Sequence, residues 1–203
     1  MDKNQEHLNN LTEIRSLMEK SSTFISLSGL SGISAGIIGL AASVVFYNIT
    51  SSVREPYMYA VMESTIIELL VTGLITVILA FAAAIFFTSL KAKKKQQPLW
   101  SSTSRRLLVN LFIPLITGGI FCLYLLYNLY LTLLVPSMII FYGLALINAS
   151  KYTLSQVRYL GLSEAVLGLI SLFFFDYAVQ FWALGFGVLN LIYGFVMYMK
   201  NEK

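Results

Sequence analysis

Two carboxylic acids lie inside long apolar stretches, and they are the residues with the clearest chemistry. Glu164 falls within the apolar block 155–199, and Glu68 near the start of the block 66–90. A charge in hydrocarbon costs about 2.5 kcal/mol or more and usually marks an ion pathway or a paired site. Burial disfavours a charged carboxylate, so Glu164 could carry a proton. Alternatively, Glu164 is a neutral or hydrogen-bonded residue that fixes helix packing with Asn190 or Asn110.

Glu68 belongs to a polar stripe. Thr65 precedes it by three residues, and Thr72 and Thr76 follow at four-residue steps, which places all four on one helix face. Such a stripe can line a wet vestibule that enters from the outer face of a membrane, although threonines in membrane helices also bond to their own backbone carbonyls. An outer vestibule at Glu68 and a carboxyl at Glu164 would together form a two-sided path for a proton or a small cation.

Small residues recur along the first apolar stretch. Ser28, Gly32 and Gly36 lie four apart, and Gly39 lies on a second small-residue face with Ser31, so we expect both faces to pack closely against other helices. The string Gly29-Leu-Ser31-Gly32 also resembles the nucleophile motif of rhomboid intramembrane proteases. A nucleophilic serine needs a base, usually histidine. The only histidine, His7, lies outside the apolar stretches, so we predict that the chain is not an enzyme.

The composition indicates an integral membrane protein. Of 203 residues, 57% are hydrophobic and 12% charged, whereas soluble domains have about 45–50% apolar and about 25% charged residues. The mean hydropathy is +0.75. The sequence contains no phosphate-binding glycine loop, no metal-spaced His/Cys cluster and no H-E-x-x-H. We therefore expect no cofactor, no ATP hydrolysis and no zinc chemistry.

The apolar blocks predict an all-α bundle of six transmembrane helices over residues 22–200. A spanning helix needs about 20 apolar residues, so the 43-residue block 107–149, about 65 Å as one helix, must fold back. The best turn is at 127–130. A second turn is expected at Asp176, the only charge near the middle of the last block. The predicted spans are 23–47, 66–90, 107–127, 131–149, 155–175 and 178–199.

The basic residues predict the orientation. With six spans, 13 of the 14 lysines and arginines fall on one side and only Arg54 on the other. Positive charge marks the cytoplasmic side, so both termini are expected there. The basic loop 91–106 should set this topology and contact anionic lipid head groups, and a nucleic-acid partner is not expected. Its basic residues are Lys91, Lys93, Lys94, Lys95, Arg105 and Arg106.

Aromatic residues agree with these depths. Phe46, Tyr127 and Trp182 are expected near the outer boundary, and Trp100 and Tyr152 near the inner one. Amphipathic rings are enriched at both interfaces of a membrane.

The segment 1–21 before the first span is predicted to be a cytoplasmic amphipathic helix. Leu8, Leu11, Ile14 and Met18 recur at helical spacing among charged residues. This face could lie on the inner leaflet, or dock a partner protein or a second copy of the chain. It could equally be a helical extension that packs on the protein's own loops.

Several stretches resemble an uncharacterised family of small membrane proteins from flavobacteria and their relatives. The resemblance implies a multi-pass protein of the bacterial cytoplasmic (inner) membrane, and it brings no activity. The family often carries histidine where this chain has Asn190, so the resemblance does not support proton handling at that position. The stretches that carry it are Phe24 to Gly32, Arg105-Arg106-Leu-Leu-Val-Asn110 running on to Ile113-Pro114-Leu-Ile-Thr-Gly-Gly-Ile-Phe-Cys122, Phe141 to Tyr152, and Phe181-Trp-Ala-Leu-Gly-Phe-Gly187.

Two classes of function follow from these features. In the first, the bundle binds or conducts a small solute or ion through its interior, with Glu164, Glu68, Asn190, Asn110 and Thr72 as candidate polar residues. In the second, the protein is a membrane sensor or scaffold that acts through its N-terminal helix and the basic loop 91–106.

Overall fold

The computed structural model describes residues 28–51, 58–94 and 100–201, and every regular element in this part of the chain is helical. The predicted segment 1–21 and Lys95 lie outside the described residues. The elements are α2 (Gly29–Ser51), α3 (Met58–Lys94), α4 (Ser102–Tyr127), α5 (Leu131–Ala149), η1 (Ser150–Tyr152), α6 (Ser155–Ser171), η2 (Phe175–Tyr177), α7 (Ala178–Trp182), η3 (Ala183–Leu189) and α8 (Asn190–Asn201). α7, η3 and α8 follow one another without a break and form a single helical segment.

Five helices are long and apolar enough to cross a membrane. They are Gly29–Ser51, Ser64–Lys94, Ser102–Tyr127, Leu131–Tyr152 and Ala178–Lys200. The all-α prediction is therefore confirmed for the described residues, and the helices are those of a multi-pass membrane protein. α6 has 17 residues, or about 25 Å at 1.5 Å per residue, which is shorter than the roughly 30 Å of a bilayer's hydrocarbon core.

Both predicted fold-back turns are present. The chain turns between α4 and α5, where Leu129 adopts a positive φ of 60° and the Asn128 side chain donates to the Tyr124 carbonyl. It turns again around Asp176, which lies in η2 between α6 and α7. α5 has the predicted bounds, whereas α6 ends at Ser171, four residues before the predicted 175.

The predicted basic loop 91–106 is instead mostly helical. α3 continues to Lys94 and α4 begins at Ser102. Hydropathy marks only the apolar part of a helix, and two local features extend it here. Lysines in the last turn of α3 interact favourably with the helix dipole, and the Ser101 side chain caps α4 by accepting a hydrogen bond from the Ser104 amide at 3.1 Å.

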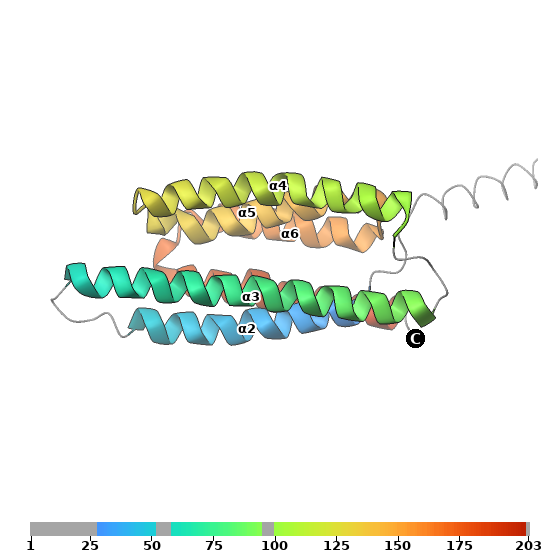
Figure 1. The fold of residues 1–203 in the computed structure, drawn as a ribbon, viewed down its shortest axis with the longest axis horizontal. Coiled ribbons are helices and arrows are strands. Elements are labelled where there is room, and N and C mark those ends of the chain that lie inside the picture. Colours follow the sequence, from blue (N-terminus) through green and yellow to red (C-terminus); the bar gives the residue numbers. More distant parts are fainter. Residues whose placement is uncertain (1–27, 52–57, 95–99, 202–203) are drawn as a thin grey trace, which may run out of the picture.

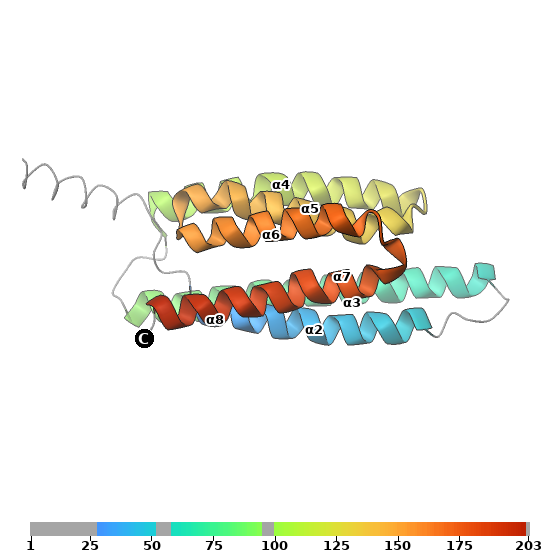
Figure 2. The same cartoon turned by 180° about the vertical axis from the view of Figure 1, so that it is seen from behind.

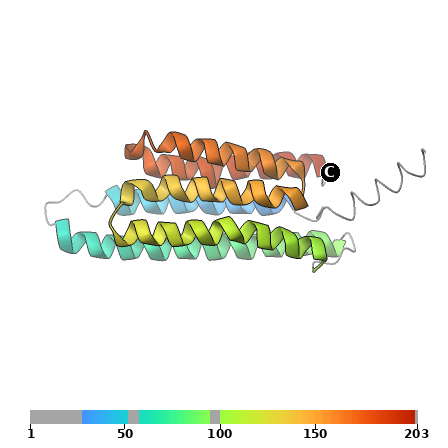
Figure 3. The same ribbon diagram turned by 90° about the horizontal axis from the view of Figure 1, so that it is seen from above.

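The helices lie side by side in two layers. α4, α5 and α6 form one layer, and α2, α3 and the α7–η3–α8 segment form the other (Figures 1 and 2). Figure 3 shows the pairing of the layers from above, with α5 and α6 in front of α2 and α8. The layers make their most extensive contact where α5 and α6 pack against the α7–η3–α8 segment. This is the region that holds the buried side chains of Glu164 and Asn190.

All lysines and arginines in the described part of the chain lie at one end of the bundle. They occupy the end of α3, the start of α4, η1, the start of α6 and the end of α8. The start of α2 lies at this same end of the bundle, beside the end of α8. The described acidic residues lie in the middle or toward the opposite end, which is the end of the 128–130 turn and Asp176. We call the first the basic end. Its cations are Lys91, Lys93, Lys94, Arg105, Arg106, Lys151, Arg158 and Lys200.

Glycines bring the neighbouring backbones into contact within each layer. A Cβ on Gly36 would lie 2.8 Å from the Gly187 carbonyl oxygen, and one on Gly32 would lie 2.9 Å from the Cα of Gly194. In the other layer, a Cβ on Gly143 would lie 2.7 Å from the Gly161 carbonyl oxygen. Van der Waals packing of this kind is the main attraction between helices in lipid, so both seams hold the bundle together.

The seam on α2 differs from the predicted pattern. Gly29, Gly32, Gly36 and Gly39 all face the α7–η3–α8 segment and are buried, so Gly39 shares a face with Gly32 and Gly36. Ser28 is buried at the start of the helix. The two predicted small-residue faces assumed strict four-residue steps along the helix. A helix has 3.6 residues per turn, so a straight contact line alternates steps of three and four.

Candidate functional site

A cluster of three polar side chains, two of them buried, lies between the two layers. Glu164 of α6 is 0% exposed and Asn190, the first residue of α8, is 4% exposed. The Asn190 amide nitrogen donates to Oε1 of Glu164 at 3.4 Å, and the Tyr142 hydroxyl of α5 donates to Oδ1 of Asn190 at 2.9 Å. We call Tyr142, Asn190 and Glu164 the polar cluster. It joins helices from both layers at mid-bundle.

The helix beside Glu164 is wider than an α-helix. Residues Ala183–Leu189 form a π-helix, a rare conformation that occurs frequently at functional sites. The side-chain amide nitrogen of Asn190 also donates to the backbone carbonyl oxygen of Gly185, at 3.1 Å and five residues earlier in the chain. Asn190 thus binds the π-helix on one side and Glu164 on the other, and it couples the backbone of η3 to the carboxyl group.

Gly185 provides the space that the carboxyl group occupies. A Cβ on Gly185 would lie 2.8 Å from Oε2 of Glu164, and then 3.5 Å from Leu167 and 3.6 Å from Ile139. Any other residue at 185 would displace the carboxyl. Leu167 and Ile139 are thus the next nearest side chains to this Cβ position, and Ile139 is itself 0% exposed.

One half of the carboxyl group is unsatisfied. Oε2 of Glu164 is buried and finds no hydrogen-bond partner among the described residues, and the same is true of the Tyr193 hydroxyl, the Trp182 indole nitrogen and Oε1 of Gln156. An unpartnered polar atom in the interior costs about 1–3 kcal/mol, more if it is charged. Polar atoms are rarely left in this state, so each needs an explanation such as a bound ligand or a catalytic role.

Aromatic rings cover the cluster on the side away from the basic end. Trp182 is buried and packs edge-on against Phe46, with ring centroids 4.9 Å apart. Phe186 lies 4.5 Å from Trp182 and 5.1 Å from Tyr142. Phe46 and Trp182, two of the rings expected near the outer boundary, are both buried and fill the space between α2, α5 and the π-helix.

The structure brings together two of the polar residues selected from the sequence. Glu164 and Asn190 are in contact, whereas Asn110 lies on α4, where its side chain donates to the Arg106 carbonyl and its own carbonyl accepts from Asn148. The alternative pairing of Glu164 with Asn110 is therefore wrong. The α2 glycines predicted to pack against other helices lie in the seam with the α7–η3–α8 segment. The basic residues lie at the basic end, away from the polar cluster.

The stripe on α3 does not reach the polar cluster. Glu68 is exposed, and α3 packs chiefly on α2. The Thr76 hydroxyl donates to the Thr72 carbonyl oxygen at 2.7 Å, which is the backbone-bonding alternative considered for these threonines. The described residues thus give no continuous polar route from Glu68 and Thr72 to Glu164.

Sequence reasoning missed Tyr142 and Gly185. Tyr142 lies near the middle of a predicted span, far from the interfacial belts where tyrosine is enriched, and a buried hydroxyl usually needs a partner. That combination could have identified it. Gly185 carried no comparable signal, because glycines are common in membrane helices and the π-helix has no local sequence signature.

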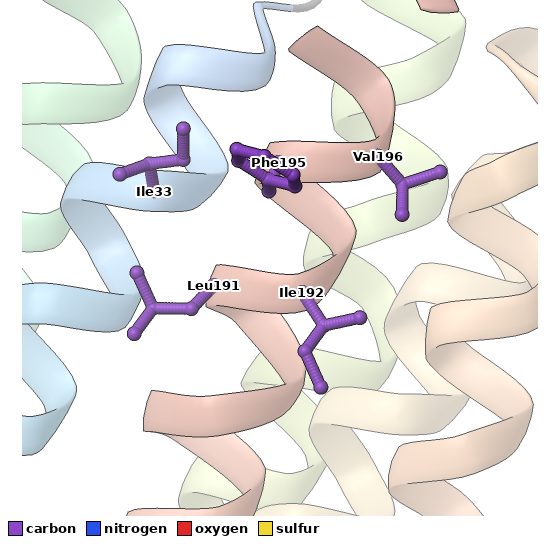
Figure 4. A pocket seen from close by; sticks show the side chains of 5 residues that line it. All are labelled: Ile33, Leu191, Ile192, Phe195 and Val196. Carbon is purple, nitrogen blue, oxygen red and sulfur yellow. The ribbon is translucent and has the colours of Figure 1, made fainter. Parts of the chain in front are cut away.

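An apolar groove on the surface is distinct from the polar cluster. It is lined by Ile33 of α2 and by Leu191, Ile192, Phe195 and Val196 of α8 (Figure 4). Ile192 and Phe195 are more than half exposed. The groove offers no polar group to a solute, so it fits the hydrocarbon chains of a surrounding bilayer.

No family model matches the chain, and searches of curated proteins and of solved structures found no match. The functional argument therefore depends on the geometry of the polar cluster.

Proposed function

We propose that this protein binds a small solute or ion inside its helix bundle, at the polar cluster of Tyr142, Asn190 and Glu164. The observation that carries the proposal is the Oε2 atom of Glu164, which is fully buried and has no partner within the part of the chain that the structure describes. A ligand at this atom would satisfy it. Conduction through the bundle would require the aromatic cover of Phe46, Trp182 and Phe186 to open.

A purely structural role explains the cluster less well. For packing alone, one hydrogen bond between Asn190 and a neutral side chain would suffice, and a carboxyl group adds the cost of a buried ionisable residue. The bond between Asn190 and Oε1 is long at 3.4 Å, near the limit of a hydrogen bond. The π-helix adds a second costly feature at the same place.

For the topology, we propose six spans with both termini on the cytoplasmic side of a bacterial cytoplasmic membrane. The support is the gathering of the described cations at the basic end, as the positive-inside rule requires of short cytoplasmic loops. α6 lies antiparallel beside α5 along most of its length (Figure 2). The three residues after it, Leu172 to Phe174, are apolar and can extend its hydrophobic length.

A membrane sensor or scaffold is the second candidate function, and one observation favours it. Arg105 and Arg106 are exposed on α4 and line a groove with Ser102, Val109 and Asn110. The described residues place no carboxylate at the basic end. Anionic lipid head groups or an acidic partner would complement this surface. Deleting residues 1–20 would abolish partner binding by a scaffold and leave ligand binding at the polar cluster intact.

The test of the proposed function is ligand-dependent stability. The purified protein would be unfolded by heat in detergent micelles at increasing concentrations of H⁺, Na⁺ or K⁺. A ligand that binds only the folded state raises the unfolding midpoint by mass action. We expect the wild type to respond to one of these ions and Glu164→Gln to lose that response. Glu68→Gln is the matched control, because Glu68 is exposed and its loss should leave the response unchanged.

A Glu164→Gln variant that responds to all three ions as the wild type does would overturn the proposed site. If Glu164→Gln does not fold, Gly185→Ala serves in its place, since it displaces the carboxyl group and removes no polar atom.

A further inference from the structure

The space around Oε2 of Glu164 limits what can bind there. A Cβ on Gly185 would lie 2.8 Å from this oxygen. This distance is shorter than a van der Waals contact, so there is no room for a methyl group between the Gly185 backbone and the oxygen. Leu167 and Ile139 lie next nearest to the same position. In this closed arrangement, only a ligand much smaller than a methyl group can reach the free oxygen from the Gly185 side.

The nearby oxygen atoms are already engaged. Oδ1 of Asn190 accepts the Tyr142 hydroxyl, and the Gly185 carbonyl accepts the Asn190 amide. Hard metal ions need about six or more oxygen ligands at once. The described residues contain no group of three or more His, Cys, Asp or Glu side chains that could hold a metal ion. A metal ion would therefore have to dismantle the polar cluster.

We infer that the ligand of the polar cluster is a proton, which binds to Oε2 of Glu164. This inference depends on the proposed function and names its ligand. The reaction is the protonation of a carboxylate to a carboxylic acid. The O–H bond forms at Oε2, and the proton comes from bulk water and returns to it, with no change in oxidation state.

Among the described residues, the elements packed around Glu164 bring no charged side chain to it. α5 contributes the Tyr142 hydroxyl and α8 contributes the Tyr193 hydroxyl, which is close enough to Tyr142 to interact with it electrostatically. α7 and η3 contain no titratable residue. Arg158, on α6 itself, is six residues away, or about 9 Å along the helix axis, at the basic end. A proton is thus the only positive charge that the enclosed carboxyl can acquire from its surroundings.

Release of the proton requires the carboxyl group to leave its enclosure. An isolated carboxylate in hydrocarbon is costly, and among the described residues only the Asn190 side chain donates to it, at 3.4 Å. The hydrogen bond from the Asn190 side chain to the Gly185 carbonyl is one that can change with the π-helix, because the same amide nitrogen also donates to Glu164. A return of η3 to α-helical bonding would alter both contacts together and so couple protonation to the shape of the sixth span.

Infrared difference spectroscopy on the full-length protein in lipid membranes tests this inference. Spectra would be recorded across a pH titration in H₂O and in D₂O. We expect a carbonyl band of a protonated carboxylic acid that grows as the pH falls and shifts in D₂O. The band should be absent in Glu164→Gln and present in Glu68→Gln.

Three outcomes would overturn the inference. The first is no protonated-acid band that depends on Glu164, which would mean a permanent carboxylate. The second is a Glu164 band that does not change over the pH range in which the protein stays folded, which would mean a structural acid. The third is loss of the band on addition of Na⁺ or K⁺ at constant pH. In that last case the metal ion is the ligand, and the proposed function survives while the proton inference fails.

Discussion

Oε2 of Glu164 lies against the backbone of Gly185, at 2.8 Å from the point where any other residue would place its Cβ. The two residues belong to different layers of the bundle, one to α6 and one to the π-helix η3. An ionisable group of one layer therefore meets a backbone distortion of the other.

Gly185→Ala should displace the carboxyl group without removing a polar atom. The new methyl group would overlap Oε2, and overpacking of this kind typically costs about 1–3 kcal/mol of unfolding free energy. We expect a folded protein with a lower unfolding midpoint and a lost or weakened response to the ion that stabilises the wild type. A variant with wild-type stability and response would show that Glu164 does not occupy the space beside Gly185.

Tyr142→Phe should weaken the polar cluster from the α5 side. The change leaves Oδ1 of Asn190 buried without its donor, which costs about 1–3 kcal/mol. Tyr159→Phe on α6 is the control, because Tyr159 is 70% exposed. Thermal unfolding of both variants in the same detergent checks the difference, and equal midpoints would contradict the hydrogen bond from Tyr142 to Asn190.

The glycine seam predicts opposite results for two identical substitutions. Gly36→Ala would push a Cβ to 2.8 Å from the Gly187 carbonyl oxygen, so α2 and η3 must separate, at an expected cost of about 1–3 kcal/mol. Gly73→Ala on α3 meets nothing within 4 Å and should leave stability unchanged or raise it by up to about 1 kcal/mol through helix propensity. Equal changes of the unfolding midpoint in Gly36→Ala and Gly73→Ala would mean that α2 does not pack against the α7–η3–α8 segment as described.

Whether α6 crosses the membrane can be measured with cysteines at its two ends. In a Cys122→Ser background, Lys151→Cys precedes α6 and Asp176→Cys follows it. A membrane-impermeant maleimide applied to intact cells and to inverted vesicles should label the two positions from opposite faces, with Lys151→Cys on the cytoplasmic side. Labelling of both from one face would leave α6 as a helix that does not span.

The sequence predicted the helices and their turns well because hydropathy and charge act locally. A 43-residue apolar block is too long to cross a bilayer once, so a turn within it followed from length, and the residues at 127–130 gave its place. Asp176 marked the second turn because its charge favours water. The helix ends were less accurate. Lys91 to Lys94 extend α3 through their interaction with its C-terminal dipole, a stabilisation that hydropathy does not measure.

The polar cluster could be predicted only in part. The depth of Glu164 and the polarity of Asn190 suggested that they might meet, since polar groups in lipid seek one another. Which partner Glu164 selects depends on which helices are neighbours in space. α6 packs on α5 and on the α7–η3–α8 segment. This arrangement, which hydropathy does not report, places Asn190 beside Glu164 and leaves Asn110 on α4.

The burial of Trp182 has the same cause. A tryptophan at the end of a membrane-spanning helix normally lies at the lipid interface. Here the Trp182 ring instead fills the space between α2 and the α7–η3–α8 segment, where it packs against Phe46 and Phe186. Which face a residue presents to its neighbours depends on helix rotation, and the weak amphipathicity of these helices does not specify it.

A proton count tests the central claim of this account most directly. Purified wild type, Glu164→Gln and Glu68→Gln would be titrated potentiometrically between the same two pH limits, with the folded state verified at each limit. We predict that the wild type binds one proton per chain more than Glu164→Gln, and that this difference is retained when the comparison is made in the presence of Na⁺ or K⁺. Superimposable curves for the wild type and Glu164→Gln would contradict an exchangeable proton on the enclosed carboxyl group.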